Sequence, residues 1–337
     1  MFPDFSNPAE WLPWAFASLM GFSILVYVIL DGFDLGVGIL FPLADDAEKD
    51  RMIGSIGPFW DANETWLVLA VGLLLVAFPV AHGMILSTLY LPVFVMLIGL
   101  ILRGVAFEFR AKAHAKHKRL WNNLFFTGSI VTALSQGFML GLYIMGLQQT
   151  PATFAFATLT AVALAVGYSF IGATWLIHKT EGELQLKAVD WAKRSLWGIV
   201  VGIGAVSLAT PLVSTRIFDR WLDFPTAFWL APIPVLSGLL VIWLWRMIRQ
   251  MPFEGDRRSW LPFAVSTAIF ALAYVGLAYS FYPYVVPDRL TIYEAASAPE
   301  SLFIILVGAC FVVPTIAGYS ILAYYIFRGK AAALRYY

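Results

Sequence analysis

The stretch TWLVLAVGLLLVAFPVAHGMILSTLYLPVFVMLIGLIL, Thr65–Leu102, contains no Asp, Glu, Lys or Arg. A helix of about 20 apolar residues crosses the hydrocarbon core of a bilayer, so this stretch is long enough for nearly two crossings. Pro79, His82 and Gly83 interrupt it near its middle, and such residues favour a break between two helices. The stretch therefore predicts two consecutive transmembrane helices.

The composition of the whole chain indicates the same class. Its 337 residues are 60% hydrophobic and 13% charged, with a mean hydropathy of +0.78, whereas soluble domains are near half apolar and a quarter charged. The net charge of +1 gives no basic field for binding nucleic acid. Cys310 is the only cysteine, which excludes an internal disulfide. The first ten residues carry no Lys or Arg, so we expect the first helix to be retained rather than cleaved as a signal peptide.

Seven further apolar runs complete the predicted architecture. Trp11–Leu30 begins the first of them, and Gln148–Pro151 divides a longer run into two helices. The predicted fold is all-α, a polytopic membrane protein whose residues 1–337 form one transmembrane domain of nine helices in bundles. These helices are expected near 11–42, 60–79, 84–109, 120–147, 152–178, 194–213, 226–248, 259–282 and 300–327.

The positions of the basic residues predict the orientation. Nineteen of the 22 Lys and Arg residues lie in, or close to, the alternate loops and the C-terminal tail on one side, and three lie on the other side. Cytoplasmic loops carry the excess of Lys and Arg. We therefore expect a periplasmic N-terminus and a cytoplasmic C-terminus.

Two acids lie inside the first predicted helix, in the motif DGFDLGVG. Asp31 and Asp34 are three residues apart and so share one face, and Gly32 and Gly36 would let a neighbouring helix approach closely. If the helix ends near Pro42, Asp34 lies roughly 12 Å inside it. An ionisable group at that depth is costly unless it is paired, protonated or hydrated, and such groups commonly mark proton or ion paths.

Other charged residues are predicted in the same leaflet. Asp61 and Glu64 begin the second helix, and Arg103 and Glu108 end the third. The alternatives are structural: Asp61 or Glu64 would complement a helix dipole, and Arg103 would either extend to the membrane surface or neutralise Asp34.

Histidines are scarce and lie at helix ends or in loops. His82 is expected in an external turn, and His114, His117 and His178 in cytoplasmic loops or at a helix end. A haem buried in the membrane needs an axial ligand within a helix. We therefore expect no redox centre on this chain.

Several stretches resemble one family. Asp31–Gly38 (DGFDLGVG) and Gly57–Leu67 (GPFWDANETWL) resemble the N-terminal motifs of subunit II of the cytochrome bd-type quinol oxidases. Thr180–Lys187 (TEGELQLK) and Phe281–Pro287 (FYPYVVP), with YEAA from Tyr293, look like the same family. The resemblance extends from the first helix to the last, and the short chain looks most like the cyanide-insensitive oxidase branch.

The resemblance implies a haem-free subunit II of a bacterial inner-membrane oxidase. Its partner, subunit I, would carry two b haems and haem d, oxidise ubiquinol on the outer side and reduce dioxygen to water with protons from the cytoplasm. A small single-helix subunit is a further candidate partner, and a quinone or lipid could bind this chain.

The resemblance also implies roles for individual residues. Asp61 matches the family acid assigned to proton entry, and Asp34 matches the neighbouring acid of the first motif. Trp66 matches the second motif's later tryptophan, near which oxygen would enter from the membrane, and Trp60 and Asn63 are supporting residues of that motif.

Two positions depart from the family pattern. Ala62 replaces a frequent glycine, and Tyr293 and Glu294 stand where Trp-Asp is common. We carry no role to Tyr293 and Glu294.

The sequence therefore predicts the proton-handling subunit of a quinol oxidase. Asp61, Asp34, Asp31 and Glu64 would transfer protons, with Arg103 and Glu108 in support. Two other functions remain open: a proton-coupled secondary transporter, which would often show internal repeats and broken helices, and an assembly scaffold in which every acid is a structural partner.

Overall fold

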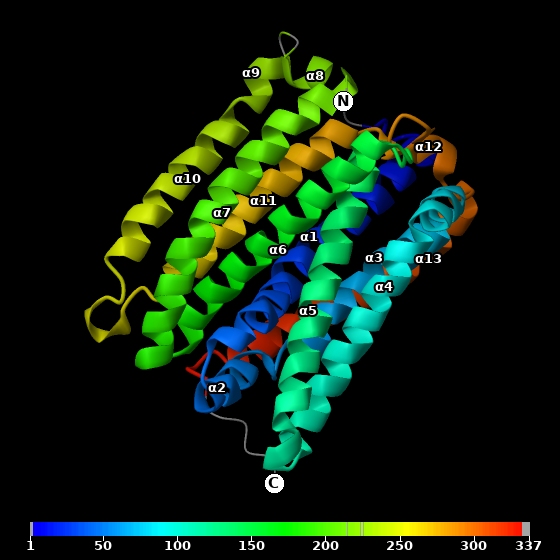
Figure 1. The fold of residues 1–337 in the computed structure, drawn as a ribbon. Helices are drawn as coiled ribbons and strands as arrows, with labels where there is room; N and C mark the ends of the chain where they lie inside the picture. Colours follow the sequence, from blue (N-terminus) through cyan, green and yellow to red (C-terminus); the bar gives the residue numbers. More distant parts are fainter. Residues whose placement is uncertain (1–2, 214, 223, 225, 332–337) are drawn as a thin grey trace.

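The computed structural model describes residues 3–213, 215–222, 224 and 226–331. Within these residues, nine helices are long and apolar enough to cross a membrane, and Figure 1 shows them running side by side. The predicted all-α fold with nine transmembrane helices is confirmed. The nine are α1 (Pro8–Leu40), α3 (Trp60–Ala77), α4 (Pro79–Lys112), α5 (Ala115–Ile144), α6 (Pro151–Lys179), α7 (Glu183–Val213), α10 (Pro232–Arg249), α11 (Leu261–Phe281) and α13 (Pro299–Ile326).

Short elements connect these helices at the two ends of the molecule. They are η1 (Phe41–Leu43), α2 (Asp46–Ile56), α8 (Thr215–Leu222), α9 (Thr226–Leu230), η2 (Glu254–Asp256), α12 (Ile292–Ala295) and a two-stranded antiparallel hairpin of β1 (Tyr284–Val286) and β2 (Leu290–Thr291). The hairpin and α12 lie at the end where the chain begins, and α2 lies at the opposite end (Figure 1).

Helix α1 runs through the middle of the molecule and packs on α3, α5 and α6. Small residues permit its close approach to α6, because a Cβ on Gly36 would collide with the backbone carbonyl of Tyr168. A Cβ on Gly172 would lie only 2.5 Å from the carbonyl carbon of Gly36. The close helix contact predicted from Gly32 and Gly36 is therefore confirmed, and it fixes the acids of α1 inside the bundle.

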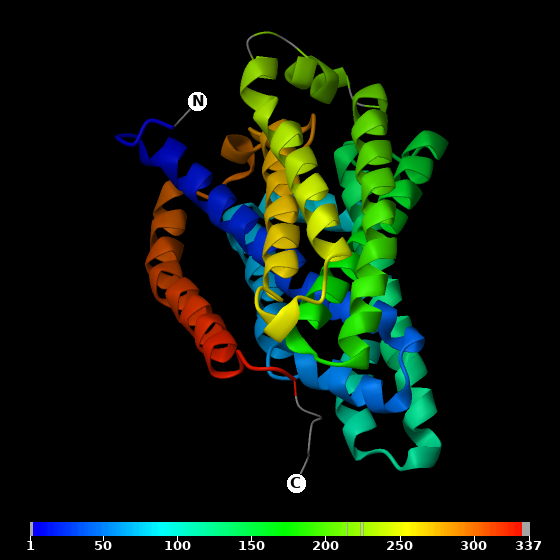
Figure 2. The same ribbon diagram turned by 90° about the vertical axis from the view of Figure 1, so that its left-hand side faces the viewer.

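Helix α13 is the least enclosed of the spans. It contacts α3 and α1, and Figure 2 shows it along the outer edge of the molecule, set apart from α10 and α11. Large apolar side chains, including Ile304 and Phe311, are exposed along it. On a transmembrane helix such side chains can face lipid, so the position of α13 depends on the specific contacts that it makes with the other helices.

Three of the differences between the expected and the observed helix bounds have a clear physical cause. Helix α4 begins at Pro79, so His82 lies within its first turns rather than in a loop, because a proline is favourable at the start of a helix. Helix α7 begins at Glu183 instead of near 194, since its first turns carry charged residues that a hydropathy criterion rejects. The helix expected over 226–248 is divided into α9 and α10 just before Pro232, which lacks a backbone N–H.

Candidate functional site

A buried ion pair joins α1 to α4. Nη2 of Arg103 lies 2.6 Å from Oδ1 of Asp31, and these two residues are 3% and 0% exposed. The same nitrogen lies 3.6 Å from Oε2 of Glu64, whose side chain is 30% exposed. Arg103 therefore does not extend to the membrane surface, and it pairs with Asp31 rather than with Asp34.

Asp34 has a different partner. Nδ2 of Asn63 donates a hydrogen bond to Oδ2 of Asp34 over 2.8 Å and another to the carbonyl oxygen of Leu30 over 3.3 Å. The hydroxyl of Tyr324, from α13, donates to Oδ1 of Asn63 over 2.9 Å. Asp34 is 1% exposed, so three helices enclose this acid and its amide partner.

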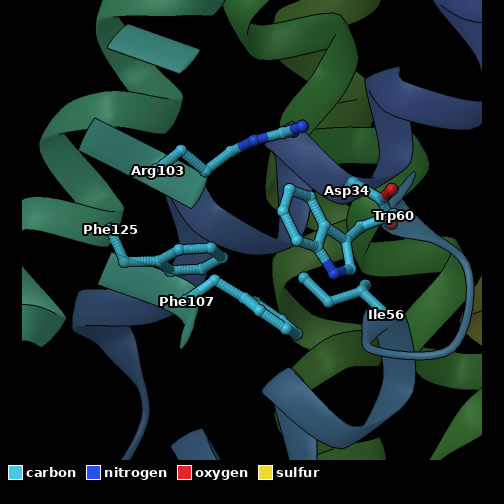
Figure 3. A pocket seen from close by; sticks show the side chains of 6 residues that line it. All are labelled: Asp34, Ile56, Trp60, Arg103, Phe107 and Phe125. Atoms are coloured by element: carbon cyan, nitrogen blue, oxygen red, sulfur yellow. The ribbon is translucent and has the colours of Figure 1, made fainter. Parts of the chain in front are cut away.

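A small cavity separates the two polar groups. Asp34 and Arg103 line it together with Ile56, Trp60, Phe107 and Phe125, and Figure 3 shows the indole of Trp60 below the guanidinium of Arg103 and beside Asp34. Its volume is about 10 Å³, which is about the smallest space that holds one water molecule. Oδ1 of Asp34 and Nη1 of Arg103 are buried and have no hydrogen-bond partner among the described residues. Both residues line the cavity, although the rest of its wall is apolar.

A second polar chain leads away from Asp31. Tyr27 lies one turn earlier on α1 and its hydroxyl interacts with Asp31. Nε2 of Gln136, on α5, donates to the Tyr27 hydroxyl over 2.6 Å, and the hydroxyl of Tyr168, on α6, donates to Oε1 of Gln136 over 2.7 Å. Sequence reasoning missed these residues. The only local signal was Tyr27, which lies four residues before Asp31 on the same face of the helix.

The remaining predicted residues lie around this centre. Asp61 and Glu108 are exposed, although Asp61 is close enough to Glu64 for their charges to interact. Trp60 packs against Phe107, with ring centroids 5.1 Å apart. A series of charged groups with decreasing exposure therefore runs from the surface into the bundle: first Asp61, then Glu64, then the Arg103–Asp31 pair.

Trp66 is buried between α3, α1 and α13. Its Nε1 donates to Oγ of Ser320 over 3.3 Å, and its ring makes an edge contact with Phe22 at 5.8 Å. Among the described residues, its hydrogen bond and its ring contact are therefore to Ser320 and Phe22 and not to the buried acids.

The residues of this site do not fit a metal or haem. The described residues contain no group of three or more His, Cys, Asp or Glu side chains that could hold a metal ion. The cavity between Asp34 and Arg103 has space for about one water molecule, far less than a haem requires.

Comparison with known proteins adds an independent observation. Residues 12–327 match the model of the family described as cytochrome bd terminal oxidase subunit II. The chain is 28% identical over 325 residues to cytochrome bd ubiquinol oxidase subunit 2 of Bacillus subtilis, covering 91% of this chain and 93% of the relative. It is 27% identical over 359 residues to cytochrome bd-I ubiquinol oxidase subunit 2 of Escherichia coli, covering 93% of each.

A solved structure has the same fold. A chain of the bd oxidase from Geobacillus thermodenitrificans superposes with a TM-score of 0.75 at 16% identity, covering 95% of this chain and 99% of that one.

Proposed function

This chain belongs to the cytochrome bd terminal oxidase subunit II family, and we propose that it carries protons from the cytoplasmic side towards the dioxygen-reducing centre of a partner subunit. Its relatives are named as ubiquinol oxidase subunits, so the chain is a subunit of a quinol oxidase. It is a multi-pass protein of the bacterial inner membrane, and the oxidase contains a partner subunit I and haems. Family membership removes the stand-alone transporter from consideration.

The observation that carries the proposal is the series of acids around Arg103. Asp61 is exposed at the start of α3, Glu64 is partly exposed and lies 3.6 Å from Arg103, and Asp31 is buried 2.6 Å from the same guanidinium nitrogen. Buried ionisable groups in a membrane are costly unless they serve transport or are paired. In the proposed path Asp61 takes up the proton, Glu64 passes it inward, and Arg103 holds Asp31 in place; Glu108 adds negative charge near the surface.

Asp34 is the innermost acid of the path. In this proposal, one water molecule in the cavity of about 10 Å³ connects the Arg103–Asp31 pair to Asp34. That water would receive the proton from Glu64 and pass one of its own to Oδ1 of Asp34, while the guanidinium of Arg103 stays charged and only donates a hydrogen bond to the water from Nη1. These two atoms are among the buried polar atoms that have no hydrogen-bond partner in the described residues. Asn63 then holds Oδ2 of Asp34 in a fixed orientation.

Two further roles belong to the same proposal. Trp66, buried and flanked by Phe22, would lie on the route by which oxygen enters from the membrane. The exposed apolar faces of α4 and α13, with side chains such as Tyr90 and Phe311, would support assembly with subunit I. A small single-helix subunit, a quinone or a lipid would contact the surfaces that remain.

The redox chemistry belongs to the partner in this proposal. Subunit I would hold two b haems and haem d, which oxidise ubiquinol and reduce dioxygen. This chain contributes proton transfer and would bind none of the haems.

The test uses the purified oxidase complex. Asp34→Asn and Asp61→Asn should each lower the oxygen-consumption rate and the rate of proton uptake, with haem content and subunit ratio unchanged. Glu181→Gln, an exposed acid outside the site, is the matched control. Wild-type rates in both Asp variants would refute proton transfer, whereas loss of haem with the lost rate would favour the scaffold function.

A further inference from the structure

Helix α13 reaches the acid site through only one face. Ser320 and Tyr324 are four residues apart and so lie on the same side of the helix. Oγ of Ser320 accepts from Trp66 and the hydroxyl of Tyr324 donates to Asn63. Both partners belong to α3, so these two hydrogen bonds dock an otherwise exposed helix against the helix that carries Asn63.

The amide of Asn63 has each of its polar atoms in use. Its Nδ2 donates to Asp34 and to the carbonyl oxygen of Leu30, and its Oδ1 accepts from Tyr324. In the reversed orientation, Oδ1 would face the carbonyl oxygen of Leu30 and the ionised carboxylate of Asp34, and none of these oxygens can donate a hydrogen bond; the clash with Leu30 remains when Asp34 is protonated. The hydroxyl of Tyr324 can accept as well as donate, but only the observed orientation also satisfies Asp34 and Leu30.

The ring of Tyr324 is itself held in place. It stacks on Phe59, with centroids 4.5 Å apart and planes 16° apart. Just beyond it, Nζ of Lys179 on α6 donates to the carbonyl oxygens of Phe327 and Gly329, over 2.6 Å and 2.5 Å. The end of α13 is therefore anchored to α6, and the hydroxyl of Tyr324 has little freedom to leave Asn63.

We propose that Tyr324 is a positioning residue for the acid site: its hydroxyl fixes the Asn63 amide in the orientation that donates to Asp34, so that docking of α13 on α3 completes the hydrogen bonding of Asp34. The effect on turnover rests on the proposed function of Asp34. The effect on the hydrogen bond of Asp34 does not.

The variant that tests this is Tyr324→Phe in the intact oxidase complex. It removes one hydroxyl and keeps the stacked ring on Phe59. Tyr325→Phe is the matched control, because Tyr325 is the next residue on α13, is 64% exposed, and contacts Arg328 rather than the acid site.

Infrared difference spectroscopy gives the direct measurement. The carboxyl band of Asp34 is first identified by its loss in Asp34→Asn. In Tyr324→Phe this band should change frequency, and proton uptake should slow by about fivefold, the order expected when a hydrogen bond between two uncharged groups is lost. Tyr325→Phe should leave both unchanged.

The outcomes separate the two proposals. An unchanged Asp34 band in Tyr324→Phe would overturn the positioning role. A shifted Asp34 band in Tyr324→Phe, combined with a wild-type rate of proton uptake in Asp34→Asn, would support the positioning role and refute the proton-transfer function. If Tyr324→Phe does not assemble, Tyr324→Leu is measured instead, because it also lacks the hydroxyl and fills the space with an apolar side chain. A shift of the Asp34 band in Tyr324→Leu, and no shift in Ser320→Ala, supports the positioning role, and an unshifted band in Tyr324→Leu overturns it.

Discussion

Replacing Arg103 with methionine should destabilise the complex strongly. Methionine has a similar length and no charge, so the carboxylate of Asp31, which is 0% exposed and 2.6 Å from the guanidinium, would lose its counter-charge. Removing one member of a buried ion pair costs about 3–5 kcal/mol, because the remaining charge is left uncompensated. We expect a loss of unfolding free energy in this range.

The second substitution distinguishes an ion pair from a packing effect. Asp31→Asn in the Arg103→Met background removes the stranded charge, so the double variant should be less destabilised than the sum of the two single variants. Residues in contact usually show interaction energies of about 0.5–3 kcal/mol in such cycles. We expect the coupling to lie at the upper end, since both groups are buried.

The assay is an unfolding titration of the purified complex in mixed micelles, followed by tryptophan fluorescence. Arg194→Gln is the control, because Arg194 pairs with Asp190 at 2.8 Å while both side chains remain exposed, and exposed pairs contribute little. An Arg103→Met variant as stable as Arg194→Gln, or a strictly additive double variant, would refute the buried-pair reasoning.

Two further predictions follow from other parts of the fold. Burial acts to raise the pKa of Asp256, but hydrogen bonds from Lys330 and Gln185 outweigh it and hold that pKa below its usual value. The contribution of the Asp256–Lys330 pair to holding the segment that follows α13 should therefore be fully present above pH 3.8 and be lost as the pH falls through the lowered value, while the hydrogen bonds from Lys179 remain. Limited proteolysis of this segment, measured as a function of pH, tests the prediction. In the Asp256→Asn variant, the segment should be cleaved to the same extent at all pH values. Gly36→Ala should reduce the yield of assembled, haem-containing complex because its Cβ would meet a backbone carbonyl of α6, at a cost of about 1–3 kcal/mol. Gly72→Ala, whose Cβ would meet nothing within 4 Å, should give the wild-type yield, and equal yields for the two variants would contradict the close-contact reasoning.

Much of the fold follows from local properties of the chain. Charge-free stretches long enough to cross a bilayer predicted nine helices, because the cost of burying a charge in hydrocarbon acts on each segment separately. The spacing of Asp31 and Asp34 placed both on one helix face for the same local reason. Where the helix bounds differed, as at Glu183, a helix extended beyond its apolar stretch. Hydropathy does not detect such an extension.

The acid site was predicted in part. The motif residues of α1 and α3 identified Asp34, Asn63 and Asp31, and the comparison with relatives supports the family that those motifs suggested. The partner of Arg103 was not predictable, because Asp31 and Asp34 lie on the same face and either could have met it. Only the packing of α4 on α5 and α3, which brings Arg103 within reach of α1, selects Asp31.

The sequence by itself determined that this protein spans the membrane, that its first two spans carry acids, and that these acids stand in a family motif. The tertiary structure alone decided which side chains surround them. Gln136, Tyr168 and Tyr324 come from three other helices, and an isolated polar residue in an apolar run gives no sign of its partner. Hydrogen bonds between helices depend on distances across the bundle, and those are set by packing at contacts such as Gly36 against α6 rather than by any local pattern.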